Sequence, residues 1–182
     1  MDRIGIAEFE KVSFEQWKTD MLSGDFKEVY SHLPVTALKE IYDKIKLPKR
    51  STFSAAGYDF FLPIPMLDIP VNTSITIPTG IRCKMNEEWM LSIFPRSGHG
   101  FKYGLHLANS VGIIDSDYYM GNNEGHIHIK LVNDSLLKKH IEFNQGDAFC
   151  QGIFIPFGIT ANDDKDEKEV RKNGFGSTDR RH

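Results

Sequence analysis

The chain has 182 residues, of which 40% are hydrophobic, and its formal net charge at pH 7 is −3. This length and apolar content allow one buried core with an appended segment. The slight negative charge excludes a bulk electrostatic attraction to nucleic acid or to an anionic membrane surface, so neither is expected as a partner. The sequence contains no run of about 18 apolar residues, which a membrane-spanning helix would need.

The N-terminal quarter is predicted to hold one strand and two helices. Residues 3–12 alternate between apolar and polar side chains, as a strand does. Helical spacing of apolar residues comes next in 13–22, where Ser13 and Gln16 match a capping box, and again in 36–48. We expect these two helices to pack on each other or to cover an apolar face of the remaining chain.

Strands are predicted for most of the chain beyond these helices. From about residue 53, short apolar runs alternate with Pro, Gly and Asn turns, which favours an all-β barrel or sandwich. The composition changes again after residue 160, because between residues 161 and 174 only Ala161 and Val170 are apolar. Such a segment cannot anchor itself in a core, so we expect it to be mobile without a ligand.

The pattern therefore divides the chain into four parts. They are a first strand over 1–12, a helical insertion over 13–47, a β-barrel domain over 48–160 and a C-terminal arm over 161–182.

The two cysteines, Cys83 and Cys150, lie far apart within apolar, strand-like runs. We expect buried free thiols rather than a disulfide or a metal pair. The N-terminal stretch is charged throughout and lacks the apolar segment of a signal peptide. Together these features predict a cytoplasmic location.

The stretch ANSVGIIDSDYYMG, residues 108–121, places a carboxylate directly after an apolar run. An ionised carboxylate in apolar surroundings either shifts its pKa or finds partners. Asp115 therefore has two interpretations: it begins an ordinary turn after a strand, or it is a functional acid.

Several other polar stretches are candidate sites. FPRSGHG, residues 94–100, places an arginine at a strand end or in a simple turn, and Gln151 interrupts an apolar strand. The arm contains GFGST, residues 174–178, in which glycine amides and hydroxyls can face an anion. Phe175 between the glycines can stack on a base, and the alternative is a flexible tail.

Five stretches, taken in order, resemble the motifs of the trimeric dUTPase family: AAGYD, PRSG, ANSVGIIDSDY, GDAFCQ and RKNGFGST. The resemblance runs from about residue 48 to residue 178. It implies a distorted jelly-roll β-barrel, with the helical segment as an insertion near the N-terminus. It also implies hydrolysis of dUTP to dUMP and pyrophosphate by water attack on the α-phosphorus, with Mg²⁺ as cofactor. The partners implied are the substrate dUTP and two further copies of the chain, in a homotrimer whose sites are shared between subunits.

The resemblance also assigns roles to residues. Asp115 matches the carboxylate that orients and deprotonates the water, and Tyr118 matches the aromatic ring under the deoxyribose. Asp59 matches an acid that acts on the outer shell of the Mg²⁺ ion or only structurally. The residues matching the uracil-reading hairpin are Asn109, Gly112, Ile113 and Ile114. Those matching the triphosphate site are Arg96, Ser97, Gly98 and Gln151. Those matching the closing arm are Arg171, Phe175, Gly176, Ser177 and Thr178.

This sequence departs from the family pattern in three places. The turn after Tyr118 is lengthened to YMGNNEGHI, which leaves the roles of Glu124 and His126 open. The last motif ends with Asp179, whose charge would repel a polyphosphate unless Arg180 offsets it. The insertion over 13–47 has no counterpart; outer packing is the favoured role, and contact with a protein partner is the alternative.

Three other functions are alternatives. A metal hydrolase would use His126 and His128, two residues apart on one strand face, but the sequence offers no obvious third ligand. A dCTP deaminase of the same fold would need a glutamate in the strand HIHIKLVN, which has none. A nucleotide-gated regulatory module would use the helical insertion to contact another protein.

Overall fold

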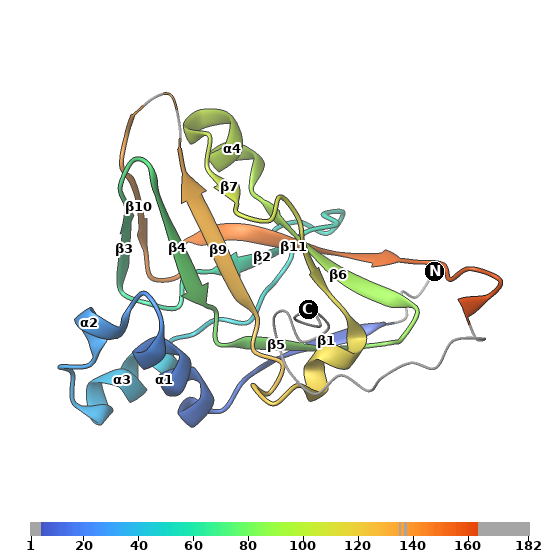
Figure 1. Cartoon of the computed structure of the whole chain (residues 1–182), viewed down its shortest axis with the longest axis horizontal. Coiled ribbons are helices and arrows are strands. Elements are labelled where there is room, and N and C mark those ends of the chain that lie inside the picture. Colours follow the sequence, from blue (N-terminus) through green and yellow to red (C-terminus); the bar gives the residue numbers. More distant parts are fainter. Residues whose placement is uncertain (1–4, 135, 137, 164–182) are drawn as a thin grey trace, which may run out of the picture.

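The structure is a computed structural model that describes residues 5–134, 136 and 138–163. Strands predominate, and the longer helices come from the first 43 residues of the chain and lie together at one end of the molecule (Figure 1). This confirms the predicted all-β class with a small helical segment. In chain order the elements are β1 (Ala7–Lys11), α1 (Phe14–Ser23), α2 (Lys27–Tyr30), α3 (Val35–Asp43), β2 (Tyr58–Phe61), β3 (Met66–Ile69), β4 (Thr73–Pro78), β5 (Ile81–Met85), β6 (Trp89–Pro95), α4 (Ser97–Tyr103), β7 (His106–Leu107), β8 (Gly112–Ile114), the 3-10 helix η1 (Ser116–Met120), β9 (His128–Asn133), β10 (Ile141–Asn144) and β11 (Ala148–Pro156).

The strands of the described part of the chain form small antiparallel sheets, arranged as in a β jelly roll. Two sheets position the site: one has the order β2-β11-β6-β8, and the other has the order β4-β9-β7. The remaining pairs are β1 with β5 and β3 with β10. In the first sheet Gln151 of β11 lies opposite Asp59 on one side and Phe94 on the other, which brings three of the sequence motifs side by side.

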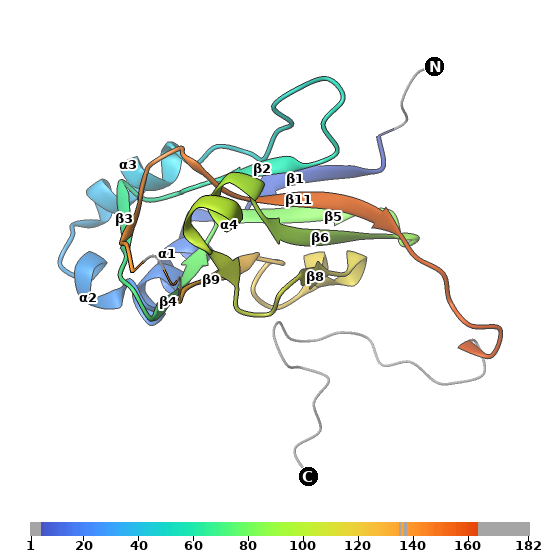
Figure 2. The ribbon, with the colours of Figure 1, turned by 90° about the horizontal axis from the view of Figure 1, so that it is seen from above.

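The helices and the sheets share one hydrophobic core. Trp17 and Met21 of α1 are fully buried, as are Phe60 of β2 and Phe149 of β11, and all belong to the same cluster. Figure 2 shows α1, α2 and α3 together at one end of the sheets, beside β3 and β4. The helical segment therefore packs against the strands, and its boundaries at residues 13 and 47 stay a prediction.

The predicted capping box at the start of α1 is only half formed. Ser13 is the N-cap residue, and its Oγ accepts the N–H of Gln16 at 3.1 Å. The backbone N–H of Ser13, however, donates to Oε2 of Glu124 at 2.7 Å, and its hydroxyl donates to Oε1 at 2.7 Å. The reciprocal carboxylate of the cap thus comes from a loop 111 residues away, because the lengthened turn after η1 lies against this helix end.

Sequence reasoning missed the short elements. Helices α2 and α4 and the pair β3–β10 were not predicted, and α4 replaces the turn expected after Arg96. Cys83 and Cys150 are buried free thiols, as predicted. Within the described ranges no helix is both long enough and apolar enough to cross a membrane.

Candidate active site

The segment expected to form a base-reading hairpin instead joins two sheets, because β7 pairs with β9 whereas β8 pairs with β6. We keep the name hairpin for this segment, residues 107–114. The turn between β7 and β8 contains Ser110 at φ 62°, whose N–H donates to the carbonyl of Leu107 at 3.1 Å. Strand β8 then pairs with β6, with Gly112 opposite Ile93. A Cβ on Gly112 would lie 3.2 Å from Cβ of Ile93, a tight contact that Ile93 would have to relieve by moving a few tenths of an ångström. Glycine avoids this crowding between β8 and β6.

This hairpin forms one wall of a mostly apolar cavity of about 390 Å³, a volume within the range of small-molecule sites. We call it the nucleoside pocket. Strands β4 and β9 form the opposite wall, contributing Thr76, His128 and Lys130 among others. All four residues predicted for the uracil-reading hairpin line this pocket: Asn109, Gly112, Ile113 and Ile114.

A second hollow, of about 550 Å³, contains the residues predicted to hold the triphosphate, and we call it the phosphate hollow. Arg96 precedes helix α4, and its Nε lies 3.0 Å from Oδ1 of Asp59. A Cβ on Gly57 would lie 2.4 Å from Oε1 of Gln151, so the glycine of AAGYD leaves room for that amide. The predicted residues that line the hollow are Asp59, Arg96, Ser97, Gly98 and Gln151.

Gln151 has a backbone partner, as its position inside an apolar strand requires. Its Nε2 donates to the carbonyl of Pro95 at 3.2 Å. The second N–H of this amide group and its carbonyl oxygen remain for other partners in the same hollow.

Asp115 occupies the N-cap position of η1, and its carbonyl accepts the N–H of Tyr118 at 3.2 Å. The backbone of Asp115 therefore begins a turn, and a functional role for its side chain stays a prediction. The side chain is half-buried and lines a third hollow, of about 690 Å³, together with Lys84, Glu87 and Phe157. A half-buried carboxylate at the end of a paired strand is restricted in orientation. This suits a group whose oxygen must accept a proton from a water molecule at a fixed position.

Tyr118 lies deeper than its predicted role suggests. Tyr118 is only 3% exposed, and its hydroxyl donates to the carbonyl of His126 at 2.8 Å. The hydroxyl oxygen of Tyr118 also accepts from Nδ2 of Asn123 at 2.9 Å. Gly125, at φ 70°, allows the lengthened turn to fold back over this ring. The structure thus shows an anchoring role for Tyr118, and its contact with a deoxyribose stays a prediction.

One copy of the chain does not collect the whole predicted site in one cavity. The nucleoside pocket, the phosphate hollow and the hollow beside Asp115 share no lining residue within the described ranges. The predicted arm residues lie outside the described residues: Arg171, Phe175, Gly176, Ser177 and Thr178.

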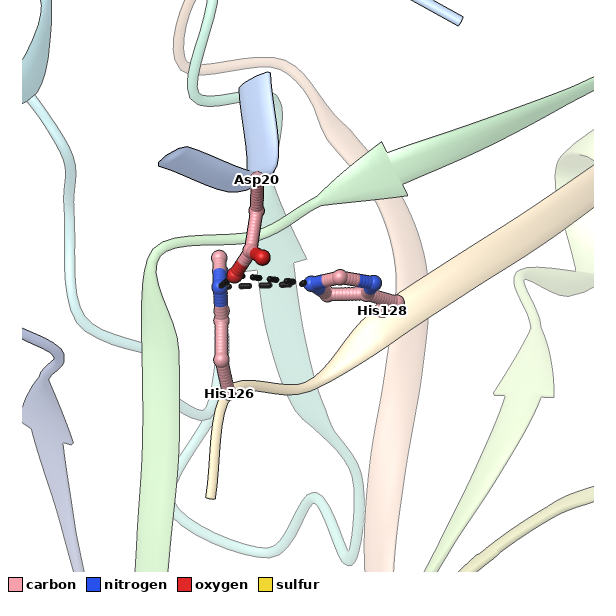
Figure 3. A group of neighbouring side chains, drawn as sticks. All are labelled: Asp20, His126 and His128. Atoms are coloured by element: carbon pink, nitrogen blue, oxygen red, sulfur yellow. Dashed lines mark hydrogen bonds and ion pairs between the residues drawn. The ribbon is translucent and has the colours of Figure 1, made fainter. Parts of the chain in front are cut away.

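A cluster of three polar side chains was not foreseen. Asp20 of helix α1 reaches between His126 and His128, with Oδ2 at 2.5 Å from Nδ1 of His126 and at 3.3 Å from Nε2 of His128 (Figure 3). The sequence offered no third partner for the two histidines, because Asp20 precedes His126 by 106 residues. No local pattern in α1 marked Asp20 as a half-buried partner, since most helix carboxylates face solvent.

Burial alone would raise the pKa of Asp20, but hydrogen bonds from His126, His128 and Gln16 outweigh it and hold that pKa well below its ordinary value. Burial lowers the pKa of His126, and this exceeds the opposite effect of its bond to Asp20. The cluster therefore holds an ionised carboxylate against a neutral imidazole.

Known proteins resemble this chain over most of its length. A family model described as dUTPase matches residues 43–179. A deoxyuridine 5′-triphosphate nucleotidohydrolase of Lactococcus lactis is 39% identical over 135 residues, which cover 74% of this chain and 88% of that protein. A protein of the same name from Legionella pneumophila strain Paris is 37% identical over 146 residues, covering 77% and 91%.

Solved structures agree with the sequence comparison. The crystal structure of a dUTPase from Streptococcus mutans has a TM-score of 0.57 and 38% identity, and the match covers 65% of this chain and 90% of that one. A mutant dUTPase from phage phi11 of S. aureus, described as coordinating a structural Mg(II) ion, shares the fold with a TM-score of 0.56 and 18% identity.

Proposed function

Because this chain belongs to the dUTPase family and hydrolyses dUTP to dUMP, we propose that Asp115 is the group that activates the attacking water. The carboxylate accepts one proton of the water while the water oxygen forms a bond to the α-phosphorus. The bond from that phosphorus to the bridging oxygen breaks, and pyrophosphate leaves with the electron pair. The observation that supports this role is the half-buried position of Asp115 immediately after the hairpin of the nucleoside pocket.

The two pockets divide the recognition of the substrate. In the proposal, the hairpin holds uracil through the backbone of 112–114 and the amide of Asn109, and its close packing on β6 leaves no room for a 5-methyl group. Arg96 holds phosphate oxygens with its guanidinium, which Asp59 orients at 3.0 Å. Ser97, Gly98 and Gln151 supply further donors in the same hollow.

The test of the base is Asp115→Asn. This variant should lower kcat for dUTP by about 10²–10⁴-fold, as the loss of a positioned base does, and leave the affinity for a non-hydrolysable dUTP analogue within about threefold. Glu40→Gln, which removes an exposed carboxylate of helix α3, is the matched control and should turn over normally. Normal pyrophosphate release by Asp115→Asn would show that another group activates the water.

We also propose that the active unit is a homotrimer with sites shared between copies. The separation of Asp115 from the phosphate hollow within one chain supports this, since another copy can bring the missing half. Asp115→Asn and Arg96→Gln, each nearly inactive alone, should regain part of the activity when unfolded together and refolded as a mixture. No recovery in mixtures that form mixed trimers would show that the Asp115 and the Arg96 of one site come from the same copy.

Mg²⁺ fits this site in a limited way. Among the described residues lining the phosphate hollow, Asp59 carries the carboxylate, and its oxygen is already paired with Arg96. Mg²⁺ commonly takes most of its ligands from substrate phosphates and water, so an outer-shell contact with Asp59 is sufficient. When bound, the ion would neutralise charge on the triphosphate.

A cytoplasmic location belongs to the same proposal, supported by the two free buried thiols. A protein partner for residues 13–47 stays a prediction.

A further inference from the structure

We propose that helix α1 and the loop after it form a brace for the nucleoside pocket, and that Asp20 and Asp25 are positioning residues for it. The proposal rests on the assignment of that pocket to the nucleoside under the proposed function. It concerns two carboxylates that lie before residue 43, where the match to the family model begins. Each of them holds a different strand of the pocket wall.

The first contact is between helix α1 and strand β9. Oδ2 of Asp20 lies 3.3 Å from Nε2 of His128, and His128 lines the nucleoside pocket. The side chain of Asp20 is 14% exposed and that of His128 is 20% exposed, so water competes little for this bond. Figure 3 shows the carboxylate pointing between the two imidazole rings.

The second contact is between the loop after α1 and strand β4. Oδ2 of Asp25 accepts the backbone N–H of Thr76 at 2.7 Å, and Thr76 also lines the nucleoside pocket. Strand β4 is the edge of its sheet, with β9 on its other side, so this N–H points away from the ladder. Two neighbouring strands of one pocket wall are thus held from outside by two carboxylates of the same segment.

His126 holds the carboxylate of Asp20 in place. The backbone N–H of Gly80 donates to Nε2 of His126 at 2.8 Å, so the ring proton must lie on Nδ1. That proton is donated to Oδ2 of Asp20, and Gln16 donates to the same oxygen at 2.9 Å. Because His126 forms hydrogen bonds to both Gly80 and Asp20, it fixes the position of the Asp20 carboxylate beside His128.

The same geometry argues against a metal ion at this cluster. The ligand atoms of Asp20, His126 and His128 lie within 4.8 Å of one another, close enough to surround a zinc ion. A metal-binding histidine normally donates its second ring N–H to an acceptor, whereas the second nitrogen of His126 already accepts from Gly80. A metal on Nδ1 would require the ring to lose both protons or to give up the bond to Gly80.

The brace predicts that base binding and phosphate binding respond differently to changes in α1. Asp20→Asn and Asp25→Ala are to be compared, singly and together, with Glu28→Gln, which removes an exposed carboxylate of α2. The ligands are dUMP for the nucleoside pocket and pyrophosphate for the phosphate hollow, with affinities measured by calorimetry. Asp20→Asn should weaken dUMP binding and raise KM for dUTP by about tenfold, with pyrophosphate affinity and kcat within about threefold.

Each other outcome overturns the proposal. Equal weakening of dUMP and pyrophosphate would show a general loss of structure, and unchanged dUMP affinity would show that the wall does not need the brace. Zinc bound at one equivalent in the purified chain and absent from Asp20→Asn would make the cluster a metal site. If Asp20→Asn does not fold, Asp25→Ala alone decides, since it removes one exposed hydrogen bond, which an asparagine oxygen could still accept. Failure of the unaltered chain to release pyrophosphate from dUTP would instead contradict the proposed function.

Discussion

The nucleoside pocket and the phosphate hollow are built in different ways. The phosphate hollow is framed by the β2-β11-β6 ladder, and its main side-chain contact, Asp59 with Arg96, joins two sequence motifs. The nucleoside pocket has a hairpin on one side, and its other wall is held by Asp20 and Asp25. Backbone hydrogen bonds between strands thus shape the phosphate hollow. The nucleoside pocket is supported by side chains from a segment that precedes the match to the family model. Changes in that segment should therefore alter recognition of the base more than recognition of the phosphates.

Among the changes that compare the two pockets, the largest effect is expected in the phosphate hollow. Arg96→Gln should lower kcat/KM for dUTP by about 10²-fold, because charge-assisted hydrogen bonds to phosphate are lost and Asp59 keeps a half-buried charge without its partner. Arg96→Lys retains the charge but not the planar guanidinium, so its kcat/KM should lie between that of the unaltered chain and that of Arg96→Gln. Kinetic assays measure kcat/KM, and pyrophosphate titrations measure the affinity of the phosphate hollow. Loss of dUMP affinity larger than loss of pyrophosphate affinity would contradict the division between the pockets.

A glycine exchange compares the two regions directly. Gly112→Ala places a Cβ 3.2 Å from Ile93, so we expect a loss of about 1–2 kcal/mol in the free energy of unfolding and weaker dUMP binding. Gly98→Ala, in the phosphate hollow, meets nothing within 4 Å and should change the unfolding free energy by less than about 0.5 kcal/mol. Urea unfolding curves of both variants give the comparison. Equal losses would mean that the hairpin accommodates a Cβ as easily as the first turn of α4 does.

The smallest effect is a pH dependence of the brace. Asp20, His128 and Glu124 are the charged or titratable groups facing His126, and burial lowers its pKa more than Asp20 raises it. Below about pH 6.5 the unfolded chain gains a proton at this ring that the folded chain does not, so the free energy of unfolding falls as the pH falls. We expect a loss of about 1 kcal/mol between pH 7 and pH 5.5.

The pKa of Asp20 lies below its ordinary value, so the stability that its ionised form adds is present above about pH 4 and is lost in stronger acid. Urea unfolding at several pH values, with His32→Gln as an exposed control, measures both losses. A flat profile from pH 7 to pH 5.5 would show that His126 takes up its proton in the folded chain as readily as in the unfolded one.

Local patterns predicted the elements whose own residues determine them. The apolar run WMLSIFP, residues 89–95, is one of the short runs predicted as strands beyond residue 53, and it forms β6, Trp89–Pro95. Apolar runs bounded by turn residues suffice to specify a buried strand. The pair β3–β10 was missed because each strand is four residues long and depends on its partner, which lies more than 70 residues away in the chain. Helix α1 was predicted correctly, including its N-cap Ser13.

For this protein the sequence alone determined the order of the motifs, the all-β class and the motif residues that line the nucleoside pocket and the phosphate hollow. Only the tertiary structure decided which polar groups meet: Glu124 completes the cap of α1, and Asp20 lies between two histidines more than 100 residues later. Apolar periodicity is a local property, so it can be read from a short window. A hydrogen bond between distant residues needs both partners within about 3 Å, and that distance depends on how the whole chain packs.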